Sequence, residues 1–140
     1  MRVRRIAATL VASAMLGFGL TSAAVAEDDC KSHFENIALN KETRRWTDNY
    51  KDGNSTTITL SHCINSSAGG STADPRFDLR RHRSLMPDAT YGEKQAGNCR
   101  LTTTTKSWGK MTTNGDFFFR YRGINGTTQR LSASTVKVAW

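Results

Sequence analysis

The feature that most constrains the fold is a series of short segments in which apolar and polar residues alternate. Successive side chains of a β-strand point to opposite faces, so this alternation is typical of strands with one buried face. In the clearest segment, Phe117 and Phe119 face one way, whereas Arg120 and Arg122 face the other. The predicted strands cover residues 56–64, 76–83, 101–108, 116–122 and 131–140, with a further one at 46–50.

Turn residues separate these segments. Gly, Pro, Asn and Asp favour tight turns because they tolerate or enforce the backbone angles that turns require. They recur at Asp52-Gly53-Asn54, Gly69-Gly70, Asp74-Pro75, Pro87-Asp88, Asn114-Gly115 and Asn125-Gly126. The last of these pairs predicts a hairpin between the final two strands. The pattern as a whole predicts an all-β, single-domain β-sandwich or small barrel of about six or seven short antiparallel strands behind a short amino-terminal leader.

The last predicted strand contains an irregularity. Leu131 and Ala133 have the opposite phase to Val136 and Val138, so in an unbroken strand the two pairs would point to opposite faces. An extra or kinked residue reverses the faces of a strand, and we therefore expect a bulge or break near Ser134.

The amino terminus has the three parts of a secretory signal peptide. Residues 2–5 include three arginines, residues 6–20 are apolar, and Ala-Val-Ala at 24–26 fits the small-x-small cleavage rule. Residues 1–26 are therefore predicted to be removed, so that the exported chain begins at Glu27. An uncleaved membrane anchor is the alternative, although the apolar stretch is short and rich in Ala and Gly for a membrane span.

The remaining chain divides into a leader at 27–45 and a β domain at 46–140. Phe34, Ile37 and Ala38 stand at positions i, i+3 and i+4, a spacing that favours one short helix in the leader.

The net charge bears on location and partners. It is +8 for the whole chain and falls to +5 when the three arginines of residues 1–26 are removed. Moderately basic exported proteins meet anionic cell walls, polysaccharides or nucleic acid, although the same charge also keeps a protein soluble. No further segment is apolar enough to cross a bilayer, so the predicted location is extracellular, without a membrane span after cleavage.

Three cysteines remain after cleavage, and an oxidising compartment favours one disulfide with one thiol left over. We expect a Cys63–Cys99 bond, because each of these cysteines adjoins a strand-like segment whereas Cys30 lies in the leader. The bond would close a loop of about 36 residues and stabilise the fold by roughly 3–4 kcal/mol in the chain-entropy model. Pairing of Cys30 with either of the other two remains an open alternative.

Residues 76–83 carry four arginines and a histidine. On an extended strand, Arg76, Asp78, Arg80 and His82 share one face. Such a row can grip phosphate or carboxylate groups, because a guanidinium fork donates two parallel hydrogen bonds. The alternative is a solvated edge strand whose charges prevent pairing with another sheet.

Aromatic rings offer a second candidate surface. Most are expected in the core, but Tyr91 and Trp108 each precede a glycine and are the rings expected to be partly exposed. Exposed rings stack on sugars or on nucleic-acid bases. The predicted binding residues are therefore Arg76, Arg80, His82, Tyr91 and Trp108.

A catalytic interpretation has weaker support. His62, His82 and the nearby arginines resemble the acid, base and cations that a ribonuclease needs. However, His62 continues the apolar register of its segment, which predicts a hydrogen-bonded core residue. The chain carries no nucleophile elbow, phosphate loop, dinucleotide fingerprint or zinc-protease helix, and we expect neither a cofactor nor a metal.

Together with the Arg- and Ala-rich amino-terminal segment, three stretches resemble small secreted proteins of actinobacteria. They are Thr-Ile-Thr-Leu-Ser-His-Cys at 57–63, Phe-Asp-Leu-Arg-Arg-His-Arg-Ser-Leu-Met-Pro-Asp-Ala-Thr-Tyr-Gly at 77–92 and Ser-Trp-Gly at 107–109. The resemblance extends over most of 63–140 and brings no activity with it.

The sequence therefore favours a secreted binding protein whose partner is an anionic polymer, a glycan or an extracellular protein. Two alternatives come from other classes. One is a small hydrolase, such as a ribonuclease or a wall-active enzyme. The other is a protease inhibitor that presents the loop at 66–74, braced near Cys63.

Overall fold

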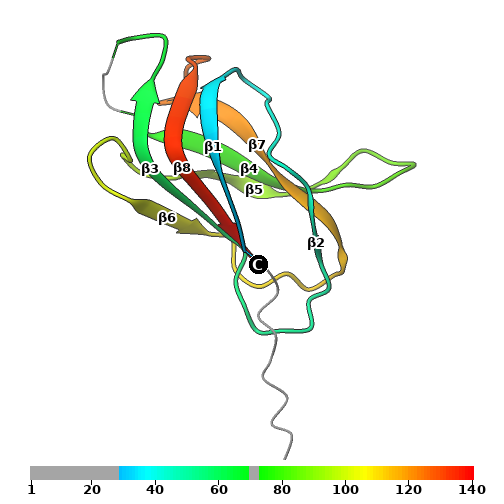
Figure 1. The fold of residues 1–140 in the computed structure, drawn as a ribbon. Helices are drawn as coiled ribbons and strands as arrows, with labels where there is room; N and C mark the ends of the chain where they lie inside the picture. The colour runs from blue at the N-terminus through cyan, green and yellow to red at the C-terminus, as the bar shows by residue number, and fades with distance from the viewer. Residues whose placement is uncertain (1–28, 70–72) are drawn as a thin grey trace, which may run out of the picture.

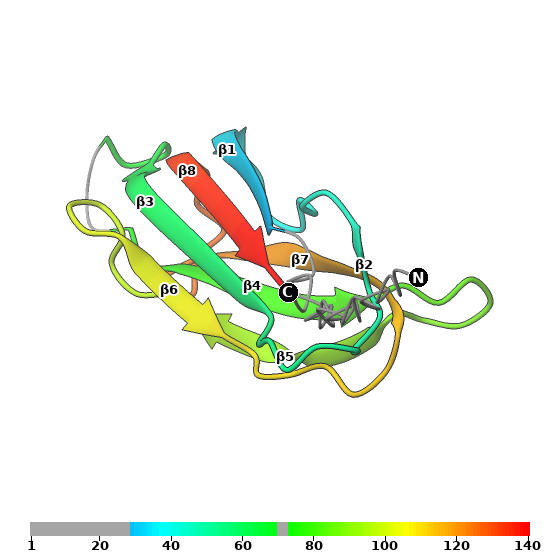
Figure 2. The same cartoon turned by 60° about the horizontal axis from the view of Figure 1, so that its bottom comes forward.

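The computed structural model of the protein describes residues 29–69 and 73–140, so the predicted signal peptide at 1–26 lies outside the described residues. This part of the chain is all-β, with eight strands in two antiparallel four-stranded sheets that pack face to face (Figures 1 and 2). The prediction of a single-domain β-sandwich is confirmed. The strands are β1 Asp29–Ile37, β2 Trp46–Asp48, β3 Thr57–Asn65, β4 Pro75–Arg81, β5 Ala89–Gln95, β6 Thr104–Ser107, β7 Gly115–Ile124 and β8 Leu131–Ala139.

One sheet has the strand order β1-β8-β3-β6 and the other β2-β7-β4-β5. Most connections carry the chain from one sheet to the other, whereas β4 and β5 follow each other and pair within one sheet. The β4–β5 hairpin projects beyond the end of the sandwich in both views (Figures 1 and 2).

The inward side chains of β7 and β4 build an aromatic core. Phe117, Phe119 and Tyr121 of β7 are fully buried, and the Phe77 ring of β4 lies 5.7 Å from that of Tyr121. From the opposite sheet, β3 and β8 contribute aliphatic side chains, namely Ile58, Leu60, Val136 and Val138. Burial of such side chains is the main stabilising term in a domain of this size.

The described part of the leader, residues 29–45, belongs to the sandwich and contains no helix. Its residues 29–37 are β1, an edge strand that pairs with β8 from Asp29 opposite Ala139 to Ile37 opposite Leu131. Phe34 turns inward and stacks on Phe77 with 6.0 Å between ring centroids. The helical spacing was therefore misleading, because pairing with β8 outweighs the weak preference of one or two helical turns.

The predicted hairpin at Asn125-Gly126 is wrong, although the turn itself forms. Both residues have positive φ, 49° and 78°, and Thr127 N–H donates to the Ile124 carbonyl at 2.8 Å. Residues with these angles suit a tight two-residue turn. However, the chain then crosses to the other sheet, since β7 pairs with β2 and β4 whereas β8 pairs with β1 and β3.

In the β1-β8-β3-β6 sheet, the set of side chains that points to the core switches between even-numbered and odd-numbered residues partway along β3 and β8. On β8, Ala133 is buried, Ser134 exposed and Val136 buried, so the predicted break near Ser134 is confirmed. His62 stands at the corresponding level of β3, with φ of 51°, and its side chain is exposed. The expectation of a core His62 is wrong, because the left-handed backbone conformation there reverses which side chains point inward.

The Cys63–Cys99 disulfide is confirmed, with 5.1 Å between the two Cα atoms. Cys99 lies between β5 and β6 and is held at its backbone too. Its carbonyl accepts from Cys63 N–H at 2.8 Å, and its N–H donates to the Ala73 carbonyl at 3.1 Å. Cys30 is a free, half-buried thiol. The bond thus ties a long loop to the middle of one sheet.

Loss of this disulfide should lower the free energy of unfolding by about 3–4 kcal/mol, because the unfolded chain gains the freedom of the released loop. The variant is Cys63→Ala/Cys99→Ala, measured by urea denaturation. Cys30→Ser is the control and should change stability by less than about 1 kcal/mol, since its thiol makes no covalent bond. Equal losses in the two variants, or a bridged Cys30 in non-reducing peptide maps, would contradict the assignment.

The left-handed His62 gives a second stability test. His62→Gly should raise the free energy of unfolding by about 1 kcal/mol, because this conformation costs a non-glycine residue roughly 1–2 kcal/mol and glycine adopts it freely. His62→Ala removes the same side chain without relieving the backbone and should stay within about 0.5 kcal/mol of wild type. A large loss in both variants would show instead that the imidazole itself stabilises the fold.

Candidate anion-binding face

The arginines of β4 point away from the core. Phe77 and Leu79 are fully buried between the sheets, so Arg76, Asp78 and Arg80 lie on the opposite, outer face of β4. This strand is not an edge, because β7 and β5 flank it on either side. The interpretation of residues 76–83 as a solvated edge strand is therefore wrong, and the charges belong to the middle of a sheet.

Neighbouring strands bring further arginines to the same surface, which we call the arginine face. Asp78 stands opposite Arg120 of β7 and Glu93 of β5, and Arg80 stands opposite Phe118. Arg45, which precedes β2, reaches the same surface over the Phe118 ring. The arginine face comprises Arg45, Arg76, Arg80, Arg120 and Arg122.

Carboxylates at two points of the arginine face each hold two guanidinium groups. Glu93 lies 3.3 Å from Arg76 and 3.5 Å from Arg122. Glu42 lies 2.8 Å from Arg120 and 3.6 Å from Arg45.

A third carboxylate is buried beneath the surface. Asp78 accepts from Arg80 Nε at 2.6 Å and from the Thr90 hydroxyl at 2.6 Å. A buried charge is stable only when it is paired and hydrogen-bonded, so Arg80 is needed to support Asp78.

An aromatic ring supports the centre of this surface. Phe118 points outward yet is fully buried, because Arg45 and Arg120 cover its ring at 5.1 and 5.8 Å from the centroid. Guanidinium groups are attracted to ring faces, and the contact fixes their orientation. The five arginine side chains remain between 22% and 46% exposed, so the surface is accessible to a ligand, although the Nε of Arg120 is itself buried.

The loop between β4 and β5 is held at its base by Asp88. His82 Nδ1 lies 3.2 Å from Asp88 Oδ1, which also accepts from Arg83 N–H at 3.3 Å. Burial alone would raise the pKa of the Asp88 carboxyl. The hydrogen bonds from Arg83 and His82 and the charge of Arg120 outweigh it and hold the pKa below the ordinary 3.8. His82 therefore belongs to the hairpin, beside the arginine face.

Tyr91 and Trp108 lie elsewhere. The Tyr91 ring packs 5.6 Å from Phe117, and the Trp108 ring packs 4.8 Å from Phe119, both against the core. Their polar atoms are partnered, since Trp108 Nε1 donates to the Gly92 carbonyl at 2.8 Å and the Tyr91 hydroxyl lies 3.2 Å from Thr113 Oγ1. The structure therefore does not bring these rings together with Arg76 and Arg80.

The structure also separates the histidines that the catalytic interpretation combined. His62 is exposed on β3 of one sheet, whereas His82 follows β4 of the other and pairs with Asp88. The loop at 66–74, which the inhibitor interpretation used, includes residues 70–72 outside the described part of the chain.

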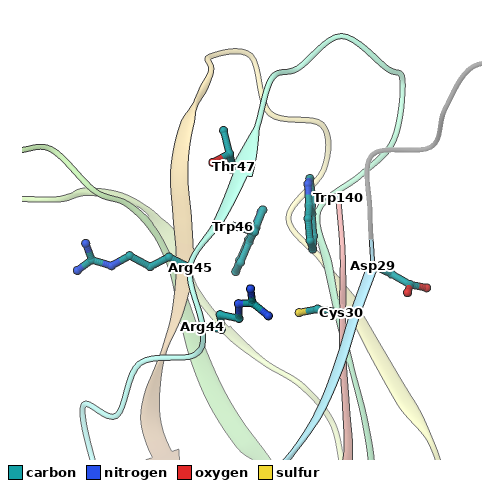
Figure 3. Close-up of a pocket in the computed structure, with 7 residues that line it drawn as sticks. All are labelled: Asp29, Cys30, Arg44, Arg45, Trp46, Thr47 and Trp140. Atoms are coloured by element: carbon teal, nitrogen blue, oxygen red, sulfur yellow. The ribbon is translucent and has the colours of Figure 1, made fainter.

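Two further hollows are lined by described residues; the first includes Arg45 of the arginine face in its lining, and the second shares no residue with that face. One, of about 410 Å³, opens beside the free Cys30 and is drawn in Figure 3. There Trp46 and Trp140 stack at 5.6 Å, Arg44 reaches toward Cys30, and Arg45 points away. The other, of about 400 Å³, is an apolar depression at the break in β3 and β8, and its lining includes His33, Phe34, His62 and Ile64.

No known protein family, curated protein or solved structure matches this chain. The described residues contain no helical segment with the length and apolar character that a bilayer crossing requires. Within the same ranges, no three His, Cys, Asp or Glu side chains gather as a metal site would need. The arginine face is therefore the surface whose chemistry indicates a ligand.

The low pKa of Asp88 predicts a pH-dependent contribution to stability. A carboxyl whose pKa is depressed by folding stabilises the native state above its unfolded pKa, and this is lost as pH falls through the folded value. Asp88→Asn should therefore be less stable than wild type at neutral pH, and the difference in stability between the two proteins should decrease as pH falls below about 3.8. Thermal midpoints between pH 7 and pH 2.5 check this. A difference that is constant with pH would contradict it.

Proposed function

We propose that this protein is an exported binding module and that the arginine face binds an anionic polymer outside the cell. The observation that carries the proposal is the gathering of five guanidinium groups on one continuous sheet surface. Phosphate, sulfate and carboxylate groups suit such donors, because a guanidinium fork matches their paired oxygens. Anionic cell-wall polymers and acidic glycans carry these groups at regular intervals.

Order on this surface supports binding. Glu93 and Glu42 each hold two arginines, and Phe118 supports two guanidinium groups from below. Long side chains that are already fixed lose less conformational freedom when a ligand binds. Among the described residues of this surface, the five arginines outnumber by one the carboxylates that lie against them, which are Glu42, Asp78, Glu93 and the neighbouring Asp88. Asp116, further along the outer face of β7, accepts from the Thr47 hydroxyl at 2.7 Å.

The shape of the surface favours a polymer. The arginines come from β4, β7 and the segment before β2, and neighbouring strands lie about 4.8 Å apart. The guanidinium groups therefore spread over a sheet surface instead of converging on one point. An extended chain with repeated anionic groups can contact several of them at once.

Export rests on two features. The Cys63–Cys99 bond is compatible with an oxidising extracellular compartment. The signal sequence proposed for residues 1–26 supplies the route.

Replacement of Arg76 and Arg122 by Ser should weaken binding to immobilised heparin about tenfold in 0.1 M salt. Both side chains bond the half-exposed Glu93, so their loss leaves no buried carboxylate unpaired. The slope of log affinity against log salt should also decrease in magnitude by about 1.5–2, because two fewer ligand charges are neutralised. Arg80 is left in place because it pairs with the buried Asp78.

The matched control is Arg44→Ser/Arg100→Ser, which removes the same charge from exposed positions outside the arginine face. It should retain most of the affinity and an unchanged salt slope. If both double variants lose affinity equally, only the net charge of the protein matters and the arginine face is not the site.

A further inference from the structure

The tip of the β4–β5 hairpin is an unusual surface. Among the described residues, the exposed large apolar side chains are Leu39, Tyr50, Ile64, Leu85, Met86 and Leu101. Only Leu85 and Met86 adjoin each other, and they are 98% and 60% exposed. They lie in the turn at the end of the hairpin that projects beyond the sandwich (Figure 2). Single exposed apolar residues are ordinary, whereas an adjoining pair at a protruding tip indicates a contact.

The hairpin holds this tip in place from below. The Arg83 guanidinium donates to the Pro87 carbonyl, with 2.7 Å from Nε, and Asp88 accepts from Arg83 N–H. His82 N–H donates to the Asp116 carbonyl at 2.7 Å. The loop is thus closed by its own hydrogen bonds and anchored to β7 by one more, while Leu85 and Met86 take part in none of these bonds. Little ordering is then needed when the tip meets a partner.

Positive charge surrounds the base of the hairpin. The Arg81 side chain packs against Gly115, so closely that a Cβ at position 115 would lie 2.7 Å from Arg81 Cδ. Arg81 Nη1 donates to the Asn114 carbonyl at 3.3 Å. With Arg83, the segment 81–88 holds two arginines against the single carboxylate of Asp88, whereas Arg80 belongs to the arginine face and pairs with Asp78. The tip itself, at 84–87, has no charged residue. An apolar end therefore stands on a cationic base.

We propose that this hairpin tip inserts into the interface of a membrane that contains anionic phospholipid. Leu85 and Met86 would enter the boundary between headgroups and acyl chains, while Arg81 and Arg83 remain level with the phosphates. Apolar insertion and attraction to anionic headgroups act together in interfacial binding, and neither alone suffices for a segment this short. This site is separate from the polymer-binding arginine face.

The test uses co-sedimentation of the exported chain with vesicles. Wild type should bind vesicles of equal phosphatidylcholine and phosphatidylglycerol and should not bind phosphatidylcholine alone. Leu85→Ser/Met86→Ser should lose at least tenfold in affinity for the anionic vesicles. Leu101→Ser, which removes a leucine that is 87% exposed elsewhere, is the matched control and should bind as wild type does.

A second measurement reports the depth of the tip. Leu85→Trp places an indole at a position that is nearly fully exposed and can accept it without repacking. Its fluorescence should be quenched by brominated acyl chains more strongly than that of the wild-type tryptophans. If the tip binds a protein pocket and not lipid, the protein will not bind vesicles and the indole will not be quenched. Absence of vesicle binding, or absence of quenching, overturns the proposal.

The same variants separate this proposal from the polymer-binding one. Leu85→Ser/Met86→Ser should bind heparin as wild type does, because heparin contains no apolar phase. Normal vesicle binding by Leu85→Ser/Met86→Ser, with loss in Arg76→Ser/Arg122→Ser, would mean that vesicles are merely another polyanion. That outcome would overturn tip insertion and leave the proposal for the arginine face intact.

Discussion

The alternation of side chains along β7 is the constraint on which the rest of the structure depends. This strand lies inside its sheet, so both of its edges are hydrogen-bonded to neighbouring strands, and its side chains alternate between the two faces. Phe117, Phe119 and Tyr121 point inward and form the centre of the core, which forces Arg120 and Arg122 outward. A slip of one residue would exchange the two faces, bury the guanidinium groups and expose the aromatic rings. The free energy of core burial therefore also fixes the position of the outward arginines.

Alternation also explains which strands could be predicted. β4 and β7 turn the same side-chain set to the core along their length, and β3 and β8 do so on either side of their break, so their sequences show period-two patterns. β5 and β1 are not predicted as strands, because most of their side chains are exposed and their sequences therefore show no apolar alternation. These two segments are strands because they pair with β4 and β8. That pairing depends on the partner strand and cannot be predicted from the segment's own sequence.

The candidate site could be predicted only in part for a related reason. The outward direction of Arg76, Arg80 and Arg120 follows from the alternation of their own strands. That β4 and β7 are neighbours does not follow, because their pairing joins segments about 40 residues apart. Glu42 and Glu93, which hold the guanidinium groups, come from segments with no recognisable pattern. The adjacent glycines correctly indicate Tyr91 and Trp108 as partly exposed rings, but both pack on the core and do not join Arg76 and Arg80.

Asp88 connects the arginine face with the hairpin. One of its carboxylate oxygens holds the hairpin base through His82 and Arg83, and the other lies 3.9 Å from Arg120. An anionic ligand on the arginine face would compete with Asp88 for Arg120 but would leave the closer contacts of the hairpin base untouched. Those contacts lie at 3.2 and 3.3 Å and include a backbone donor, so they are less exposed to competition than a pair at 3.9 Å. The two surfaces can therefore be occupied together, because the carboxylate that joins them holds the hairpin more firmly than it holds the arginine.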